Sequence, residues 1–195
     1  MSKASSFKIT AATFVQGVVA DADVLHDEVP QVALVGRSNV GKSSLINALV
    51  GSKSLAKVGK KPGKTTEINF FLINKKQYLV DLPGYGFAEA SLAMREELKK
   101  LIIWYLTASG ARPVTVALIL DVKAGLTKFD EDMLLILKDQ KHPFIIIVNK
   151  IDKLSQKEVA EQVRAIQAKA DGAEIFCASA AEREGIDAIR ERLFA

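Results

Sequence analysis

The sequence predicts an α/β fold: a six-stranded, mostly parallel sheet with one antiparallel strand and helices on both faces. Three observations support this prediction. The strand candidates are continuous apolar runs, most of them are separated by segments of helical length, and one neighbouring pair is joined by a short turn. Continuous apolar runs indicate strands that are buried on both faces, as between two layers of helices. The 195 residues are enough for one such domain.

Six short apolar runs have the length of buried strands. In chain order they are 31–35, 68–73, 78–82, 114–121, 144–148 and 174–178. Only residues 74–77 separate the second run from the third, so these two are expected to form an antiparallel hairpin.

Segments with the length and pattern of helices are 42–50, 92–108, 130–138, 156–169 and 185–193. Ser155 and Glu158 form a capping-box pair at the start of the fourth segment. The run 101–106 in the second segment is apolar nearly all round. A buried helix is the favoured interpretation of this run, and a partner-binding face that uses Trp104 and Tyr105 is the alternative.

Hydrophobic residues make up 49% and charged residues 26% of the chain, which excludes a disordered or fibrous protein. The net charge of +4 is unevenly distributed. Residues 29–66 contain seven Lys or Arg and no Asp or Glu, so the rest of the chain carries a net charge of −3. An acid-free basic stretch indicates a local site for polyanions. Its segment 53–64, which is rich in Lys and Gly and has no periodicity, is expected to be a long mobile loop.

Cys177 is the single cysteine, which excludes an internal disulfide and a cysteine-cluster metal site. With two histidines beside it, the chain has too few ligands for a zinc centre. The N-terminus lacks the pattern of a secretory signal, and no apolar run has the length of a membrane span. We therefore expect a cytoplasmic monomer with no membrane partner, with an N-terminal arm over residues 1–29 and one domain over residues 30–195.

The segment GRSNVGKSS, residues 36–44, matches the phosphate-binding pattern G-x-x-x-x-G-K-S. It follows an apolar run directly and opens a helix, which is the context that the pattern requires. Its glycines let the backbone approach phosphates, and its amides and helix N-terminus attract the anion. Lys42 is expected to reach the terminal phosphates and the Ser43 hydroxyl to bind Mg²⁺. The predicted contacts in this loop are Gly36, Arg37, Ser38, Asn39, Val40, Gly41, Lys42, Ser43 and Ser44.

Asn149, Lys150 and Asp152 follow the fifth predicted strand, at the edge where open α/β sheets bind ligands. The Asp152 carboxylate can accept two hydrogen bonds from guanine, one from the ring N–H and one from the exocyclic amine. Adenine has neither donor on that edge, so the carboxylate would stay unpaired. The end of the sixth strand is expected to complete the guanine pocket with Ala178, Ser179 and Ala180.

Two further segments are expected to meet the phosphates. Asp81 ends the third strand and would hold Mg²⁺ through water, and the Gly84 amide would sense the terminal phosphate. In the basic loop, Thr65 is the candidate second hydroxyl on Mg²⁺, and Thr66 is the competing choice. The predicted nucleotide contacts of these segments are Gly63, Lys64, Thr65, Thr66, Asp81, Leu82, Pro83 and Gly84. The candidate catalytic residues are Lys42, Thr65 and Gly84.

In this order, the motifs are similar to those of small GTPase domains related to translation factors. The segments 30–47, 62–71 and 80–88 resemble the EngB family of bacterial GTPases, and the similarity spans residues 30–195. Its most particular feature is TyrGlyPheAla at 85–88. The resemblance implies a six-stranded P-loop GTPase G domain that binds GTP or GDP with Mg²⁺. It also implies action in the assembly of the large ribosomal subunit, with a link to division-septum formation.

The chain departs from the family pattern at two places. Asn149 stands where the family more often has Thr, which leaves guanine recognition intact. After Asp121, ValLysAla replaces the usual Arg-His pair, so no role of those side chains is carried over. Tyr85 occupies the position that usually carries a water-orienting Gln, so intrinsic hydrolysis is expected to be slow. GTPases with Asn at the position of Asn39 often bind K⁺, which would stabilise charge on the phosphates; a loop-shaping Asn39 is the alternative.

The loop 53–64 together with Thr65 would be the switching element. Its lysines would contact rRNA of the large-subunit precursor, and the alternative is that they only keep the loop soluble. These lysines are Lys53, Lys57, Lys60, Lys61 and Lys64. Two other functions stay open: a GTPase that acts directly in cell division or tRNA modification, and a nucleotide-dependent rRNA-binding module with negligible hydrolysis. Asp152 disfavours an ATPase or a nucleoside kinase.

Overall fold

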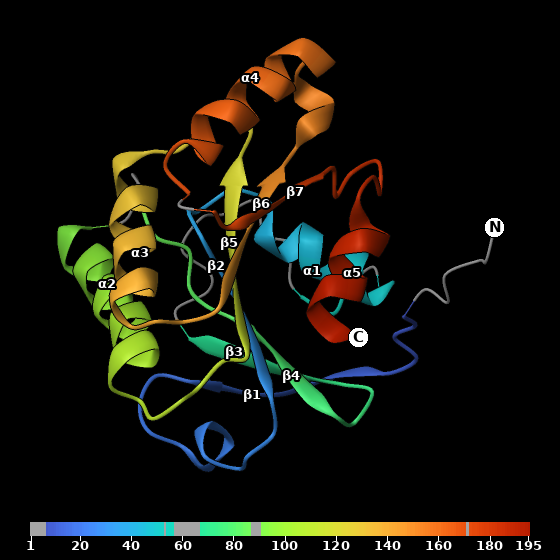
Figure 1. Cartoon of the computed structure of the whole chain (residues 1–195). Coiled ribbons are helices and arrows are strands. Elements are labelled where there is room, and N and C mark those ends of the chain that lie inside the picture. Colours follow the sequence, from blue (N-terminus) through green and yellow to red (C-terminus); the bar gives the residue numbers. More distant parts are fainter. Residues whose placement is uncertain (1–6, 53, 57–66, 87–90, 171) are drawn as a thin grey trace.

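A mixed β-sheet lies between two layers of helices (Figure 1). The structure is a computed structural model and describes residues 7–52, 54–56, 67–86, 91–170 and 172–195. Within these residues the sheet has seven strands in the order β1-β3-β4-β2-β5-β6-β7. The strands are β1 (Ala12–Val18), β2 (Gln31–Gly36), β3 (Ile68–Ile73), β4 (Gln77–Asp81), β5 (Thr115–Asp121), β6 (Phe144–Asn149) and β7 (Glu174–Ala178).

All strands except β3 run in the same direction. β2 pairs in parallel with β4 and β5, and β6 pairs in parallel with β5 and β7. β3 is antiparallel to both of its neighbours, β1 and β4. The prediction of a mostly parallel sheet with one antiparallel strand is therefore confirmed. Because five neighbouring strands are parallel, their carboxyl ends meet at one edge of the sheet, where such folds bind ligands.

The expected count of six strands is wrong, because residues 12–18 of the predicted arm form β1 at the edge of the sheet. This strand carries no continuous apolar run, and Phe14 and Val15 are 54% and 41% exposed. An edge strand needs no burial on both faces, so the criterion that finds central strands misses it. The backbone of Thr10 and Ala11 also donates to the Asn74 side chain in the β3–β4 turn.

The helices cover both faces of the sheet, as predicted (Figure 1). α1 (Lys42–Val50) and α5 (Ile186–Phe194) share one core, and α2 (Leu92–Thr107), α3 (Lys128–Asp139) and α4 (Gln156–Gln167) contribute to the other. These bounds lie within two residues of the predicted ones. The capping box of Ser155 and Glu158 is present at the start of α4. Two short 3-10 helices, Asp23–Leu25 and Ile151–Lys153, lie in the connections. No helix in the described part of the chain is both long and apolar enough to cross a bilayer.

The apolar run 101–106 is buried at three positions and partly buried at the other three, which agrees with the favoured interpretation of a core helix. Ile102, Tyr105 and Leu106 are at most 2% exposed. The Tyr105 hydroxyl donates to the Gln31 side chain at 2.8 Å, so the buried phenol keeps a hydrogen-bond partner. Trp104 is partly buried against the same core.

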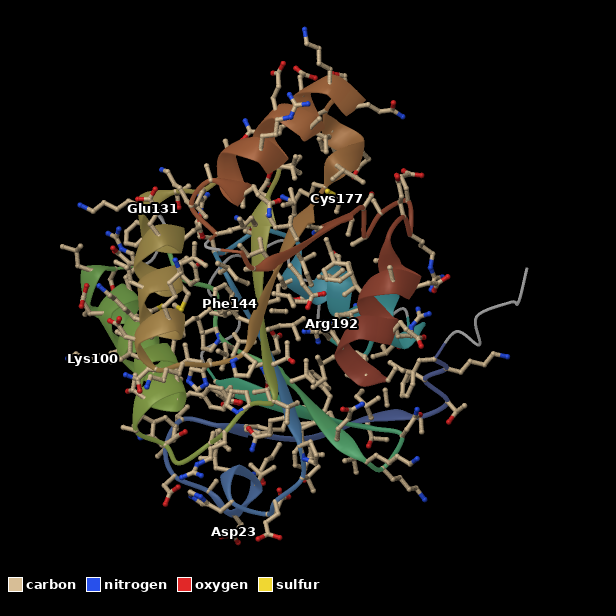
Figure 2. All side chains as sticks on the ribbon, in the orientation of Figure 1. Asp23, Lys100, Glu131, Phe144, Cys177 and Arg192 are labelled. Carbon is tan, nitrogen blue, oxygen red and sulfur yellow. The ribbon has the colours of Figure 1, made fainter. Side chains whose placement is uncertain are left out.

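α5 fixes the far end of α1. The Arg190 guanidinium donates to the carbonyls of Leu49 and Ala48 at 2.7 and 3.3 Å. These carbonyls belong to the last turn of α1, where the Ala48 carbonyl also accepts from the Gly51 amide at 3.3 Å. Arg192 of α5, which is labelled in Figure 2, pairs with Glu174 of β7 at 2.8 Å. Cationic side chains of the last helix thus hold both α1 and β7.

Replacing Asn74 with Gly should loosen β1. The Asn74 oxygen accepts from the Thr10 and Ala11 amides, and its amide group donates to the Lys8 carbonyl. Glycine removes these bonds without strain, because φ at Asn74 is +50°. We expect the free energy of unfolding to fall by about 1 kcal/mol and amide exchange over residues 7–18 to become faster. Hydrogen-exchange mass spectrometry measures exchange over residues 7–18 and over the rest of the sheet in one experiment.

The matched control is Lys75→Gly, an exposed position of the same turn whose φ is also positive. If the control accelerates exchange over residues 7–18 as much as Asn74→Gly does, the Asn74 side chain is not what holds β1.

Candidate nucleotide-binding site

The loop between β2 and α1 adopts the shape that its motif predicts. β2 is buried along its whole length and ends at Gly36, and α1 begins at Lys42. Gly41 has φ +92°, and a Cβ there would lie 2.5 Å from the Asn149 Nδ2 atom. Only glycine tolerates both the backbone conformation and this approach. The N-terminus of α1 is therefore presented at the carboxyl edge of the sheet, where it can attract an anion.

Lys42 and Asp81 form an ion pair at the base of this loop. They are 7% and 3% exposed, so each charge is compensated by the other in a buried place. For Lys42 to reach phosphates, the Asp81 carboxylate must exchange this partner for another cation. Mg²⁺ fits that exchange, since the Asp81 carboxylate and the Ser43 hydroxyl are the hard oxygen donors that it prefers. Of the residues predicted for Mg²⁺, Asp81 ends β4 and Ser43 lies in the first turn of α1, while Thr65 lies outside the described residues.

Asn149 joins the phosphate-binding loop to the end of β7. Its side chain is 1% exposed, and its amide nitrogen donates to the Val40 carbonyl at 2.8 Å. Its amide oxygen accepts from the Ala180 amide at 3.2 Å. One buried side chain therefore sets the distance between the loop predicted for phosphate and the loop predicted for guanine.

Lys150 makes a second connection from the same segment. Its Nζ atom donates to the Asn39 carbonyl at 2.6 Å and pairs with Asp121 Oδ2 at 2.7 Å. Asp121 ends β5, and sequence reasoning assigned it no role in the site. Its place opposite Asn149 in the parallel register of β5 and β6 could have indicated one. Asn39 has φ +66°, a conformation that Asn tolerates, which favours its loop-shaping interpretation.

Asp152 presents a carboxylate that is already hydrogen-bonded. Its Oδ2 atom pairs with Lys153 at 2.8 Å, and its Oδ1 atom accepts from the Ser179 hydroxyl at 2.6 Å. The bond from Lys153, followed by that from Ser179, lowers the pKa of Asp152, so the group stays ionised near neutral pH. Ser179 is fully buried, and its hydroxyl oxygen accepts from the Glu182 amide at 3.1 Å. The carboxylate keeps lone pairs for two further donors.

Residues 81–86 lie against the phosphate-binding loop. The Ser38 amide donates to the Tyr85 carbonyl at 2.8 Å, and a Cβ at Gly84 would lie 3.0 Å from the Ser38 Cα atom. Through this amide, Ser38 ties the loop to the segment that follows β4. Gly84 is thereby placed beside the loop, as its predicted role requires.

The Tyr85 side chain is buried in the core and bonded to α3, a placement that the sequence did not indicate. It is 7% exposed in the core on the α2 and α3 side of the sheet, and its hydroxyl donates to Asp130 Oδ1 at 2.6 Å. Asp130 is 2% exposed, and with Thr127 it forms a capping box at the start of α3. The sequence T-x-x-D before α3 was a signal for the cap, but no local pattern pointed to Tyr85.

The structure brings most of the predicted site residues to one edge of the sheet. The segment 36–44, the segment 81–84, residues 149–152 and residues 178–180 all lie where β2, β4, β6 and β7 end. Cys177 lies on β7 next to this edge (Figure 2) and packs against the core, where burial raises the pKa of its thiol. Some predicted residues lie outside the described ones: Lys53, Lys57, Lys60, Lys61, Gly63, Lys64, Thr65 and Thr66.

The chain is similar to known GTP-binding proteins. A family model described as a 50S ribosome-binding GTPase matches residues 31–150, and one for the elongation factor Tu GTP-binding domain matches residues 106–195. The probable GTP-binding protein EngB of Aquifex aeolicus is 40% identical over 164 residues, which cover 84% of this chain and 89% of that one. The EngB protein of Geobacter metallireducens is 40% identical over 190 residues, which cover 95% and 92% of the two chains.

Solved structures agree with these relatives. The crystal structure of a probable GTP-binding protein EngB superposes with a TM-score of 0.72 at 27% identity and covers 84% of this chain and 96% of that one. A structure of Era in complex with MgGDPNP and nucleotides 1506–1542 of 16S ribosomal RNA gives a TM-score of 0.66 at 26% identity. The match covers 82% of this chain and 54% of the Era chain. The fold is thus that of a P-loop GTPase, and the chain belongs to the EngB family of GTP-binding proteins.

Proposed function

We propose that this GTPase is a slow switch that acts in the assembly of the large ribosomal subunit. The observation that supports it best is the Asn149 side chain. It joins the phosphate-binding loop at Val40 to Ala180, next to the Ser179 hydroxyl that binds the Asp152 carboxylate. The matching family model carries the description of a 50S ribosome-binding GTPase. We further propose that the protein is a cytoplasmic monomer in which residues 30–195 bind the nucleotide.

The phosphate end of the site would work by exchange of ionic partners. Lys42 would leave Asp81 and contact the terminal phosphates, and Ser43 and Asp81, the latter through water, would hold Mg²⁺. The metal, when bound, neutralises charge on the phosphates. Thr65 adds a second hydroxyl, with Thr66 as the alternative. The Gly84 amide then meets the terminal phosphate from the β4 side.

The base end of the site would select guanine by hydrogen bonding. The Asp152 carboxylate accepts from the guanine ring N–H and the exocyclic amine, and Ser179 holds the carboxylate in place. Ala178 and Ala180 complete the pocket wall. Since a buried acceptor without a donor costs a few kcal/mol, adenine nucleotides are rejected.

Hydrolysis is slow in this proposal because the residue after Gly84 does not face the phosphates. The Tyr85 hydroxyl is bonded to Asp130 in the core, so it cannot orient an attacking water. Burial, followed by the neighbouring Asp130, raises the pKa of Tyr85 well above its usual range, which keeps the phenol protonated. Activation would then come from a partner or from K⁺ bound near Asn39.

The guanine assignment predicts a change of base preference. Wild-type protein should bind GTP at least about 100-fold more tightly than ATP in calorimetry. Asp152→Asn replaces one acceptor with a donor, so the affinity for GTP should fall by a similar factor. The affinity for XTP should rise, because the carbonyl that replaces the exocyclic amine can accept from the new amide. Asp21→Asn, on an exposed carboxylate far along the chain, is the control and should bind like the wild type. Equal affinity of the wild type for GTP and ATP would contradict the assignment.

The monovalent-cation hypothesis predicts faster single-turnover GTP hydrolysis in KCl than in NaCl at matched ionic strength. A K⁺ ion near Asn39 would stabilise the charge that develops on the phosphates. Identical rates in the two salts would leave Asn39 with only its loop-shaping role. Rates indistinguishable from uncatalysed hydrolysis in both salts would favour the nucleotide-dependent binding module.

The ribosomal assignment predicts salt-dependent binding to large-subunit precursors. Changing Lys53, Lys57, Lys60, Lys61 and Lys64 to Gln should flatten the dependence of log affinity on log salt concentration, because fewer phosphate contacts release fewer counterions. Co-sedimentation with a GTP analogue across a salt series measures this slope. The control changes five other lysines to Gln, with the same loss of charge: Lys75, Lys76, Lys99, Lys100 and Lys157. If the control flattens the slope equally, the basic loop is not the contact.

A further inference from the structure

Tyr85 connects the segment that would sense the terminal phosphate to helix α3. Its hydroxyl donates to Asp130 Oδ1 at 2.6 Å, and both side chains are buried. The other carboxylate oxygen, Oδ2, accepts from the Thr127 amide at 2.9 Å and from the Thr127 hydroxyl at 2.6 Å. Both oxygens of Asp130 are therefore used, one for the cap of α3 and one for Tyr85.

The backbone of Tyr85 is held from the opposite side. Its carbonyl accepts from the Ser38 amide at 2.8 Å, and it pairs with Arg37 in a short parallel bridge. Gly84 precedes it and packs on Ser38 so closely that a Cβ would lie 3.0 Å from the Ser38 Cα atom. Tyr85 thus has one anchor on the phosphate-binding loop, through its carbonyl, and another on α3, through its hydroxyl.

The second anchor is a strong one. The bond is short, and both of its side chains are buried, so water does not compete for it. Removal of the Tyr85 hydroxyl would leave Asp130 Oδ1 without this donor in a buried place that water does not reach. Tyr85 would then be held by the phosphate-binding loop alone, and the neighbouring Gly84 would sample other positions.

We propose that Asp130 is a positioning residue that acts through Tyr85 to place the Gly84 amide for the terminal phosphate, and so increases the preference for GTP over GDP. The inference rests on the proposed function, since it assumes that Gly84 meets this phosphate. Asp130 itself touches no nucleotide. It supplies the fixed point on α3 from which the segment 81–86 is held.

The test compares affinities for GDP and for a non-hydrolysable GTP analogue by calorimetry. Tyr85→Phe removes only the hydroxyl, and it should weaken the GTP analogue about tenfold while GDP changes less than about twofold. KM for GTP should rise more than kcat falls. Tyr78→Phe is the matched control, because the buried Tyr78 also donates to a carboxylate, Asp27 Oδ2 at 2.7 Å, but lies outside the site. It should leave the affinity ratio unchanged.

Two Asp130 variants separate positioning from stability. Asp130→Asn keeps an oxygen that can accept from Tyr85 but loses the acceptor for Thr127, so it should unfold at lower temperature and yet keep the affinity ratio. Asp130→Ala loses both bonds and should lower the ratio as Tyr85→Phe does. An affinity ratio that falls in step with stability across these variants would overturn the proposal.

An unchanged ratio in Tyr85→Phe would also overturn it. A failure of the proposed function has a different signature, because the wild-type protein would then show no preference for guanine over adenine nucleotides. The two failures are therefore read from different measurements on the same samples.

Discussion

The side-chain amide of Asn149 is the contact on which the geometry of the site depends. It spans from the Val40 carbonyl to the Ala180 amide, and its approach to Gly41 leaves no room for a Cβ. The parallel register explains why one residue can do this. Asn149 lies opposite Asp121 of β5 and Ala178 of β7, so the three strand ends form one row. The pairing of the strands therefore fixes the distances between the loops that follow these three residues.

Charge compensation shapes the other half of the site. In the buried ion pair of Lys42 and Asp81, each group is the other's partner, so neither is left unpaired away from water. The same two groups are those that the proposed mechanism assigns to phosphate and Mg²⁺. Binding would replace one set of ionic partners with another and would expose neither charge. The site can therefore be buried and still be competent for a highly charged ligand.

Local signals explain what could be predicted from the sequence. Strands β3 and β7 and helix α1 have the predicted bounds because continuous apolar runs and a glycine-rich loop act within a few residues. The motif residues meet at one edge because parallel strands leave them there. In contrast, β1 is held by pairing with a strand about 55 residues away, and Tyr85 is bonded to a residue 45 positions away. Such long-range contacts have no local pattern, and burial alone does not identify them.

Helix α1 has nine residues and is therefore about 14 Å long, a length at which an isolated helix is barely stable in water. Its beginning carries the phosphate-binding residues, and its last carbonyls are capped by Arg190 from α5. The guanidinium also lies at the negative end of the α1 dipole. The last helix of the chain, α5, therefore helps to stabilise α1, whose first turn faces the nucleotide. Substitution or truncation in α5 would destabilise α1 and so weaken nucleotide binding, although Arg190 does not contact the nucleotide.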